Sequence, residues 1–218
     1  LARGNAKRKR KKFRHQCRVA EEAGGYRLLI PEDADGIDRL LEAFFQQKSE
    51  RLAEQGIANV FGSKRARDLI RGLALHSIGM REPLLRLHAL EIGGEIRAVF
   101  GAGIHDQQMS GYFSSISTDD LSAISPGEML LYLVVEKSAD EDLRAIDLGA
   151  GDERYKRSWC DGTLPLFDVI MPLGPAAWPH ALAMRLSARL RHHARSHDGV
   201  WASVRLARRL KARLFGRA

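Results

Sequence analysis

The sequence has few cysteines and no metal-binding motif. Its two cysteines, Cys17 and Cys160, lie far apart with no CxxC pair, and its eight histidines include one adjacent pair, His192–His193, but no HExxH motif. A disulfide framework or a structural zinc site needs more of these residues at closer spacing. We therefore predict free thiols, a reducing compartment and no bound metal. His88 and His105 lie in predicted strands, and we interpret both as structural.

Long apolar segments are also missing. No run of 18 or more apolar residues is present, which argues against a membrane-spanning helix. The basic start, LARGNAKRKRKKFRH, has no apolar segment after it, so it is not a signal peptide. The chain also lacks an initiating methionine, so we expect a processed form or the C-terminal part of a longer protein. Ser115 and Ser117 have no GxSxG context, and a serine hydrolase is not supported.

The charge of the chain is unevenly distributed. The net charge is +8, yet residues 1–14 carry eight Lys or Arg and no acid, and residues 180–218 carry ten with one acid. Residues 15–179 therefore hold 17 basic and 26 acidic side chains, a net charge of −9. We expect a cytoplasmic protein whose basic ends contact a polyanion, either tRNA or the anionic inner face of a membrane. A solvated N-terminal arm, and C-terminal helices that dock on the body or on a partner chain, are the alternatives.

Hydrophobic periodicity predicts a leading helix over 5–23 and then ten elements in the order β, α, α, β, β, β, α, β, α, β. The predicted strands are 26–30, 85–91, 96–104, 108–116, 143–148 and 164–171. The predicted helices are 36–54, 63–79 with core positions Ala66, Leu69, Ile70, Leu73 and Ile78, a helix that begins at Ser125 and Pro126, and 152–159. Two basic amphipathic helices follow between 180 and 215, one with Leu182, Leu186 and Leu190, the other with Trp201, Val204, Leu206, Leu210 and Leu214.

The segment SPGEML predicts an anion site at a helix N-terminus. Ser125 suits the N-cap position and Pro126 the first helical position, where its missing N–H removes no helical bond. Gly127 has no side chain to block a phosphate, and the unpaired amides of Gly127, Glu128 and Met129 would face it. An ordinary helix cap is the alternative interpretation.

The order of elements resembles the GNAT N-acyltransferases, in which the acyl-CoA diphosphate sits where SPGEML falls. A GGEIRA hairpin, an aromatic strand, SPGEMLL and then IDLGAGDERYKRSW resemble the FemAB-like branch, and within it the CelD/BcsL-type acetyltransferase domain, over about residues 5–171. The resemblance implies a mixed α/β fold: a mostly antiparallel mixed sheet flanked by helices. The expected organisation is a basic leading helix at 1–25, an acyltransferase domain at 26–174 and a basic helical tail at 175–218.

The resemblance also implies acetyl-CoA as the donor and an amine of a sugar, cell-wall precursor or polysaccharide as the acceptor. FemAB-like proteins carry two GNAT-like halves, so an upstream half is a candidate partner. Aminoacyl transfer from tRNA, and a non-catalytic module of polysaccharide biosynthesis, are the alternatives. Only Gly127 matches the usual glycine-rich, often basic phosphate loop.

The candidate catalytic residues follow the strand at 143–148. Lys156 would stabilise an oxyanion or phosphate, Tyr155 would protonate the leaving thiolate, and Asp147 would orient Lys156 or accept a proton. Gly149 and Gly151 would let the chain pass close to the ligand. The structural alternatives are a helix-capping role for Asp147, a core role for Tyr155 with Trp159, and a surface ion pair for Lys156.

Overall fold

The computed structural model describes residues 5–151 and 153–196. The chain divides into two compact units, the first made of Leu1–Arg51 with Asn59–Gly162 and the second of Leu52–Ala58 with Thr163–Ala218. The first unit holds the sheet and every predicted site residue. The second is described by itself below.

The centre of the first unit is a five-stranded mixed sheet in the order β1-β2-β3-β4-β5. Its strands are β1 (Tyr26–Leu29), β2 (Arg86–Ile92), β3 (Glu95–His105), β4 (Gln108–Ile116) and β5 (Ala145–Asp147). Neighbours pair antiparallel from β1 to β4, whereas β5 pairs parallel to β4. The predicted hairpin at Gly93–Gly94 is confirmed, since both glycines have positive φ. The mixed, mostly antiparallel sheet is therefore as predicted.

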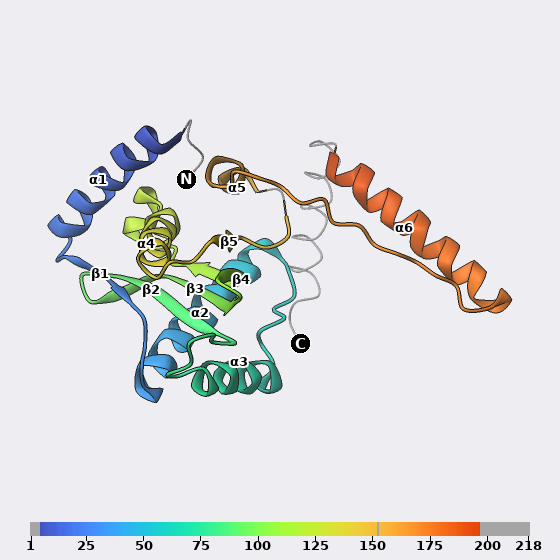
Figure 1. Cartoon of the computed structure of the whole chain (residues 1–218), viewed down its shortest axis with the longest axis horizontal. Helices are drawn as coiled ribbons and strands as arrows, with labels where there is room; N and C mark the ends of the chain where they lie inside the picture. The colour runs from blue at the N-terminus through green and yellow to red at the C-terminus, as the bar shows by residue number, and fades with distance from the viewer. Residues whose placement is uncertain (1–4, 152, 197–218) are drawn as a thin grey trace. The chain divides into compact units, whose positions relative to one another are not determined.

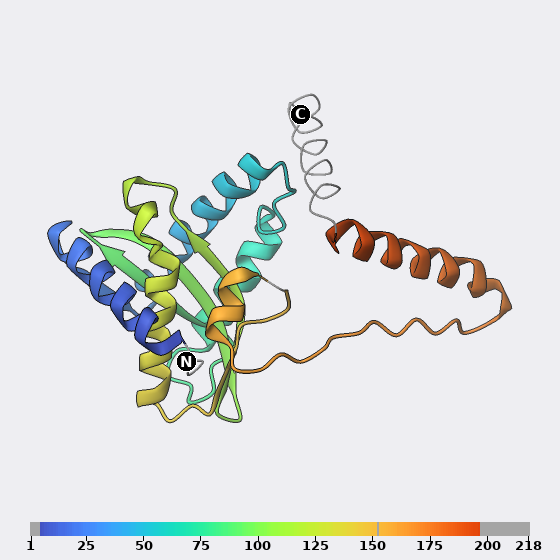
Figure 2. The ribbon, with the colours of Figure 1, turned by 90° about the horizontal axis from the view of Figure 1, so that it is seen from above.

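Helices cover both faces of this sheet (Figures 1 and 2). On one face lie α1 (Ala6–Glu22) and α4 (Pro126–Asp140), packed on a buried cluster that includes Leu90, Ala102 and Met129. On the other lie α2 (Ala34–Gln55) and α3 (Lys64–His76), whose cluster includes Phe44 and Val99. Apolar residues therefore fill both interfaces of a three-layer unit.

The leading helix α1 is part of this unit. It ends at Glu22 and is followed by Gly24 and Gly25, whose φ angles of 105° and 87° let the Gly25 amide donate to the carbonyl of Ala20 at 3.0 Å. Ala20 is fully buried and Phe13 stacks on Tyr132 of α4 with ring centroids 3.9 Å apart. The basic N-terminal segment is thus anchored by its apolar side, which also carries Lys9 and Lys12 against α4, whereas its other cations are exposed.

Two sequence-based predictions are wrong or only partly right. Residues 164–171 form no strand: their alternating apolar side chains are exposed and lie outside the sheet, because alternation creates a strand only where a partner strand is paired with it. In α3, Leu69 and Ile78 are 63% and 41% exposed, so they do not belong to the core. Only the side with Ile70, Leu73 and Ala74 packs against α2 and the sheet.

The second unit contains α6 (Trp178–Ser196), preceded by a 3₁₀ turn at Pro175–Ala177. This is the first predicted basic helix, and its leucines at 182, 186 and 190 are exposed. The second predicted basic helix lies outside the described residues. No helix within the described ranges is both long and apolar enough to cross a bilayer.

Candidate functional site

The sheet opens between its two parallel strands. β5 pairs with β4 only from Gln108↔Ala145 to Ser110↔Asp147, although β4 continues to Ile116. At the same place the register of β3 with β4 shifts, so that Tyr112 has no partner between Gly111 and Phe113. Such a bulge bends its strand and increases its twist. β5 ends at Asp147, so the β5-facing edge of β4 has no strand partner beyond Ser110.

α4 begins beside this opening, and its first turn differs from the prediction. Ser125 occupies the N-cap position, but its backbone is left-handed (φ 60°, ψ 66°) and its side chain makes no capping bond. The left-handed turn is instead held by Gln16 of α1, whose Nε2 donates to the carbonyls of Ile124 at 2.7 Å and Ser125 at 3.2 Å. Gln16 is 2% exposed, so this contact is buried.

The backbone amides of this first turn are only partly available. Those of Glu128 and Met129 donate to the Ser125 carbonyl, and Pro126 has no N–H. The amide of Gly127 has no backbone partner within the described part of the chain. A Cβ at Gly127 would lie 2.5 Å from Cδ1 of Ile116 on β4, so only glycine fits here without a shift of that side chain. One amide without a backbone partner, rather than three, therefore marks this helix N-terminus.

Two lysines of α1 neutralise the carboxylate in this turn. Lys9 and Lys12 each form an ion pair with Glu128, and the side chain of Lys9 is 5% exposed whereas that of Lys12 is 41% exposed. Burial raises the pKa of Glu128, but hydrogen bonds from Lys12 and Lys9 outweigh it and hold the pKa below its usual value. Lys12 also lies 3.4 Å from Oγ of Ser125. The group of one carboxylate and two ammoniums is net positive.

Lys9 joins the two predicted parts of the site. Its ammonium lies 4.3 Å from the ring centroid of Trp159, the last residue of α5 (Arg154–Trp159), while it also pairs with Glu128. Trp159 is 6% exposed and meets the ring of Tyr132 edge-on. The core role for Trp159 is therefore confirmed, and α5 is held against α1 and α4.

The loop between β5 and α5 is organised by Asp147 and Lys156. Asp147 accepts a hydrogen bond from the amide of Gly149 at 2.7 Å. Nζ of Lys156 donates to the carbonyls of Gly149 at 3.1 Å and Ala150 at 2.9 Å and pairs with Glu153 at 2.9 Å. An ammonium has three protons, so these contacts use all of its donors. Lys156 is 9% exposed and is directed into the loop.

The glycines keep this loop against the sheet. Gly149 has a φ of 78°, and a Cβ there would lie 3.1 Å from the carbonyl oxygen of Gly111 on β4. Gly151 has a φ of 121°, again a conformation that favours glycine. The loop thus touches β4 at the point where β4 and β5 separate.

Tyr155 differs from its neighbours in being exposed. Its side chain is 44% exposed, although Trp159 one turn later is buried. Partial burial raises the pKa of its phenol, with Lys156 opposing the effect. The phenol therefore holds its proton at neutral pH and is open to solvent on one side.

Sequence reasoning missed Lys9, Lys12 and Gln16. All three lie on the side of α1 that carries Phe13 and Ala20, at spacings of three to four residues. A polar residue three or four positions from the apolar residues of a helix lies on the same side as they do, and this spacing indicates a buried polar contact. The prediction used only the apolar residues of this segment and interpreted its cations as one basic arm.

Other titratable groups have structural roles. His88 is fully buried beside Phe100, and burial lowers its pKa to about 3, so it is neutral. Ser115 is buried and donates to Gln47 at 2.6 Å. Cys17 and Cys160 are free thiols. Among the residues that the structure describes, no group of three or more His, Cys, Asp or Glu side chains could hold a metal.

Comparisons with known proteins give a family match. A family model described as an acetyltransferase (GNAT) domain matches residues 7–157. Similar solved structures include the C-terminal domain of a putative lysylphosphatidylglycerol synthetase from Agrobacterium fabrum, with a TM-score of 0.47 and 13% identity over 68% of this chain and 43% of that one. A possible acetyltransferase from Clostridium difficile 630 has a TM-score of 0.43 and 12% identity, over 67% of this chain and 99% of that one.

An aminoglycoside acetyltransferase from an uncultured soil metagenomic sample, in complex with trehalose, has a TM-score of 0.44 and 9% identity, over 68% of this chain and 95% of that one. The chain thus spans less than half the length of the first of these three structures. A search of curated proteins gives no match.

Proposed function

Because the chain belongs to the GNAT acetyltransferase family, we propose that it transfers an acetyl group from acetyl-CoA to an amine of a sugar, cell-wall precursor or polysaccharide. The observation that carries the proposal is the β4–α4–β5 unit. Its parallel strands separate beyond Ser110, and α4 begins beside the opening with Gly127 in its first turn. An opened strand edge and a helix N-terminus together offer amides to a thioester carbonyl and to a diphosphate.

The reaction needs three tasks. The thioester carbonyl is polarised while the amine attacks it, the carbon–sulfur bond breaks, and one proton passes from the amine while another reaches the leaving thiolate. Backbone amides of the unpaired β4 edge would stabilise the oxyanion. The start of α4, with Ser125, Pro126 and Gly127, would hold the diphosphate, and Glu128 would keep Lys9 and Lys12 beside it.

Tyr155 is the proposed proton donor for the thiolate. Its phenol is half-exposed and has a raised pKa, so it carries a proton throughout the neutral range. For Lys156 we now propose a positioning role: its three donors hold the Gly149 and Ala150 carbonyls and Glu153. Asp147 would fix the same loop from the strand side.

The FemAB-like, CelD/BcsL-type assignment rests on the segment from Asp147 to Trp159 and stays a proposal, as do the domain limits at 25 and 174. The second candidate is aminoacyl transfer from tRNA. It is favoured by the exposed cations of α1 at positions 7, 8, 10, 11, 14 and 18, which have no ion-pair partner within the described ranges. An upstream GNAT-like half would then complete the acceptor site.

The decisive experiment incubates the purified chain with radiolabelled acetyl-CoA and a panel of amino sugars, lysine-containing peptidoglycan precursors and deacetylated polysaccharides. We expect acetyl-CoA to raise the melting temperature and one acceptor class to gain label. The Tyr155→Phe variant should lose about a hundredfold in kcat with unchanged acetyl-CoA affinity, because only the phenolic hydroxyl, the proposed proton donor, is removed. A salt-sensitive tRNA gel shift without acetyl-CoA protection or labelled product would refute acetyl transfer and favour the tRNA-dependent reaction.

A further inference from the structure

The segment that leads into α4 carries no cation of its own. Residues 117–129 contain three acids, Asp119, Asp120 and Glu128, and no Lys or Arg. The first basic residue of α4 is Lys137, eleven positions into the helix and therefore about 16 Å along its axis from Pro126. The charged side chains that this segment places near a diphosphate at the start of α4 are therefore all acidic. A cation must come from another element.

That element is α1. Lys12 contacts both Glu128 and Oγ of Ser125, so its ammonium lies at the start of α4. Glu128 has two lysine partners, although one positive charge is enough to balance it. Lys9 is buried between Glu128 and Trp159 and is fixed there, whereas Lys12 is 41% exposed. Lys12 is therefore able to turn toward a phosphate while Lys9 keeps Glu128 neutralised.

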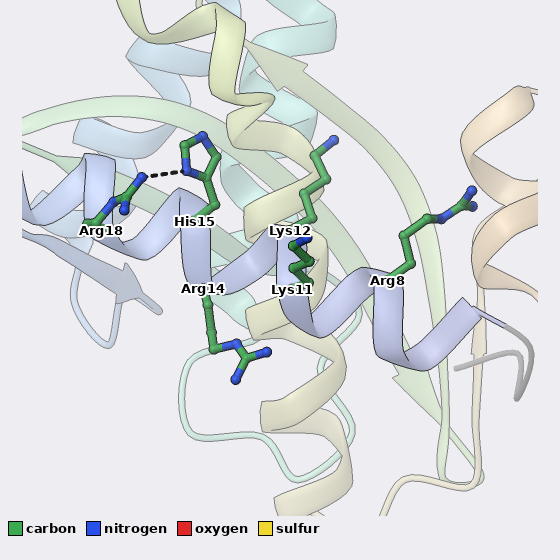
Figure 3. Close-up of a pocket in the computed structure, with 6 residues that line it drawn as sticks. All are labelled: Arg8, Lys11, Lys12, Arg14, His15 and Arg18. Atoms are coloured by element: carbon green, nitrogen blue, oxygen red, sulfur yellow. Dashed lines mark hydrogen bonds between the residues drawn. The ribbon is translucent and has the colours of Figure 1, made fainter.

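Lys12 also lines a cavity. A surface cavity of about 580 Å³ runs along α1, and Figure 3 shows its lining residues from Arg8 near one end to Arg18 near the other. The full lining is Arg8, Lys11, Lys12, Arg14, His15 and Arg18. Nη2 of Arg18 lies 3.2 Å from Nδ1 of His15. From Arg8 to Arg18 the helix rises about 15 Å, so these cations continue the positive field away from Lys12 on both sides. No acid of α1 precedes Glu21, and no acidic side chain lines the cavity.

The cavity and the helix start thus form one positive surface on a rigidly docked helix. Beyond its diphosphate, coenzyme A carries a 3′-phosphate on its ribose. We propose that α1 supplies the phosphate-binding cations of the acyl-CoA site, with Lys12 on the diphosphate and the Arg8–Arg18 cavity on the 3′-phosphate. The proposal rests on the proposed function. It assigns phosphate binding to the leading helix, because the segment before and at the start of α4 contains no Lys or Arg.

The test compares coenzyme A with 3′-dephospho-coenzyme A by isothermal titration calorimetry. The wild-type chain should bind coenzyme A about tenfold more tightly, because the missing phosphate loses charge-assisted hydrogen bonds. The double variant Arg8→Met/Arg18→Met should bring this ratio close to one without weakening 3′-dephospho-coenzyme A. Lys12→Met should weaken both ligands about equally, by roughly tenfold.

Arg10→Met is the matched control. Arg10 is an exposed cation of α1 that lines a different cavity, with Phe13 and Tyr132, and its loss changes the net charge by the same amount as Lys12→Met. It should leave both affinities unchanged. Circular dichroism of all variants would verify folding, since the cavity residues are exposed or half-exposed.

The outcomes separate this proposal from the proposed function. If the wild type acetylates an amine but binds both coenzymes equally, or if Arg10→Met acts like Lys12→Met, the role of α1 is refuted and acetyl transfer stands. If the wild type binds neither coenzyme and forms no product, the proposed function itself is refuted.

Discussion

The position of α1 depends on one glycine in the β2–β3 turn. Gly93 has a φ of 60°, and a Cβ built on it would lie 2.4 Å from the carbonyl oxygen of Ala23, the residue after α1. The favourable separation of such atoms is about 3.5 Å. Gly94 is the matched control, because its φ is 85° and a Cβ there would meet nothing within 4 Å.

Gly93→Ala and Gly94→Ala both place alanine in the left-handed region of the backbone. They differ in that only the alanine at position 93 clashes with the carbonyl oxygen of Ala23. The left-handed backbone of alanine destabilises the folded state by about 1 kcal/mol. Alanine also restricts the unfolded chain more than glycine does, which offsets about 0.5 kcal/mol of this loss. Gly94→Ala should therefore lower the free energy of unfolding by about 0.5 kcal/mol. Gly93→Ala should lower it by about 2 kcal/mol more, the cost of overpacking against a fixed backbone.

The backbone at this contact has little room to move. The amide of Gly93 donates to the carbonyl of Gly25 at 3.0 Å, and the amide of Gly25 closes the end of α1. Relief of the clash must stretch this bond or displace the end of α1. We therefore expect Gly93→Ala also to weaken binding of acetyl-CoA, since α1 carries Lys12, whereas Gly94→Ala should not.

The assay is urea unfolding followed by far-UV circular dichroism, with the two variants and the wild type measured side by side. For a body of this size the difference corresponds to about 4–8 °C in melting temperature. Equal destabilisation by the two variants would show that the contact between Gly93 and Ala23 is not tight, and the inferred anchoring of α1 to the hairpin would be wrong.

Two further predictions concern the loop and the sheet. Lys156→Met should lower stability by about 1–3 kcal/mol and raise the KM for acetyl-CoA, because two loop carbonyls lose their donor. The control is Lys137→Met on α4, whose half-exposed side chain pairs with Glu141 at 3.5 Å and contacts no loop carbonyl. Unchanged kinetics of Lys156→Met would exclude the positioning role. Glu91 accepts hydrogen bonds from Arg27 and Arg39, both at 2.6 Å, and these, with Arg27 first, hold its pKa below the usual value. This stabilisation is present above the unfolded pKa of about 4.3 and is lost as the pH falls through the lower folded pKa. Urea midpoints measured from about pH 6 to pH 3 should therefore fall less steeply for Glu91→Gln; parallel curves would contradict the assignment.

Periodicity and turn chemistry determined most of the fold. The glycines at 24–25 and 93–94 end a helix and close a hairpin because glycine adopts positive φ without strain, and the apolar spacing of α2 follows one helical face. The apolar run Met129–Tyr132 of α4 is buried on several sides of that helix. These are local properties that neighbouring residues dictate. The prediction of a strand at 164–171 was wrong for the same reason. Its alternating pattern is a local property, whereas a strand also needs a distant partner strand to pair with.

The geometry of the candidate site followed from the sequence only in part. The sequence by itself identified the start of α4 and the loop after β5 as the two segments of interest, and it determined that residues 1–14 are strongly basic. Only the tertiary structure decided that Lys9 joins these segments, that Gln16 rather than the Ser125 side chain holds the turn into α4, and that Lys156 is directed into its own loop. For Lys9 and Gln16 the physical reason is distance along the chain: contacts between residues more than a hundred positions apart depend on how α1 docks beside α4, which no local pattern encodes. For Lys156 the contacts are local, but the direction of its side chain depends on the conformation of the glycine loop before it.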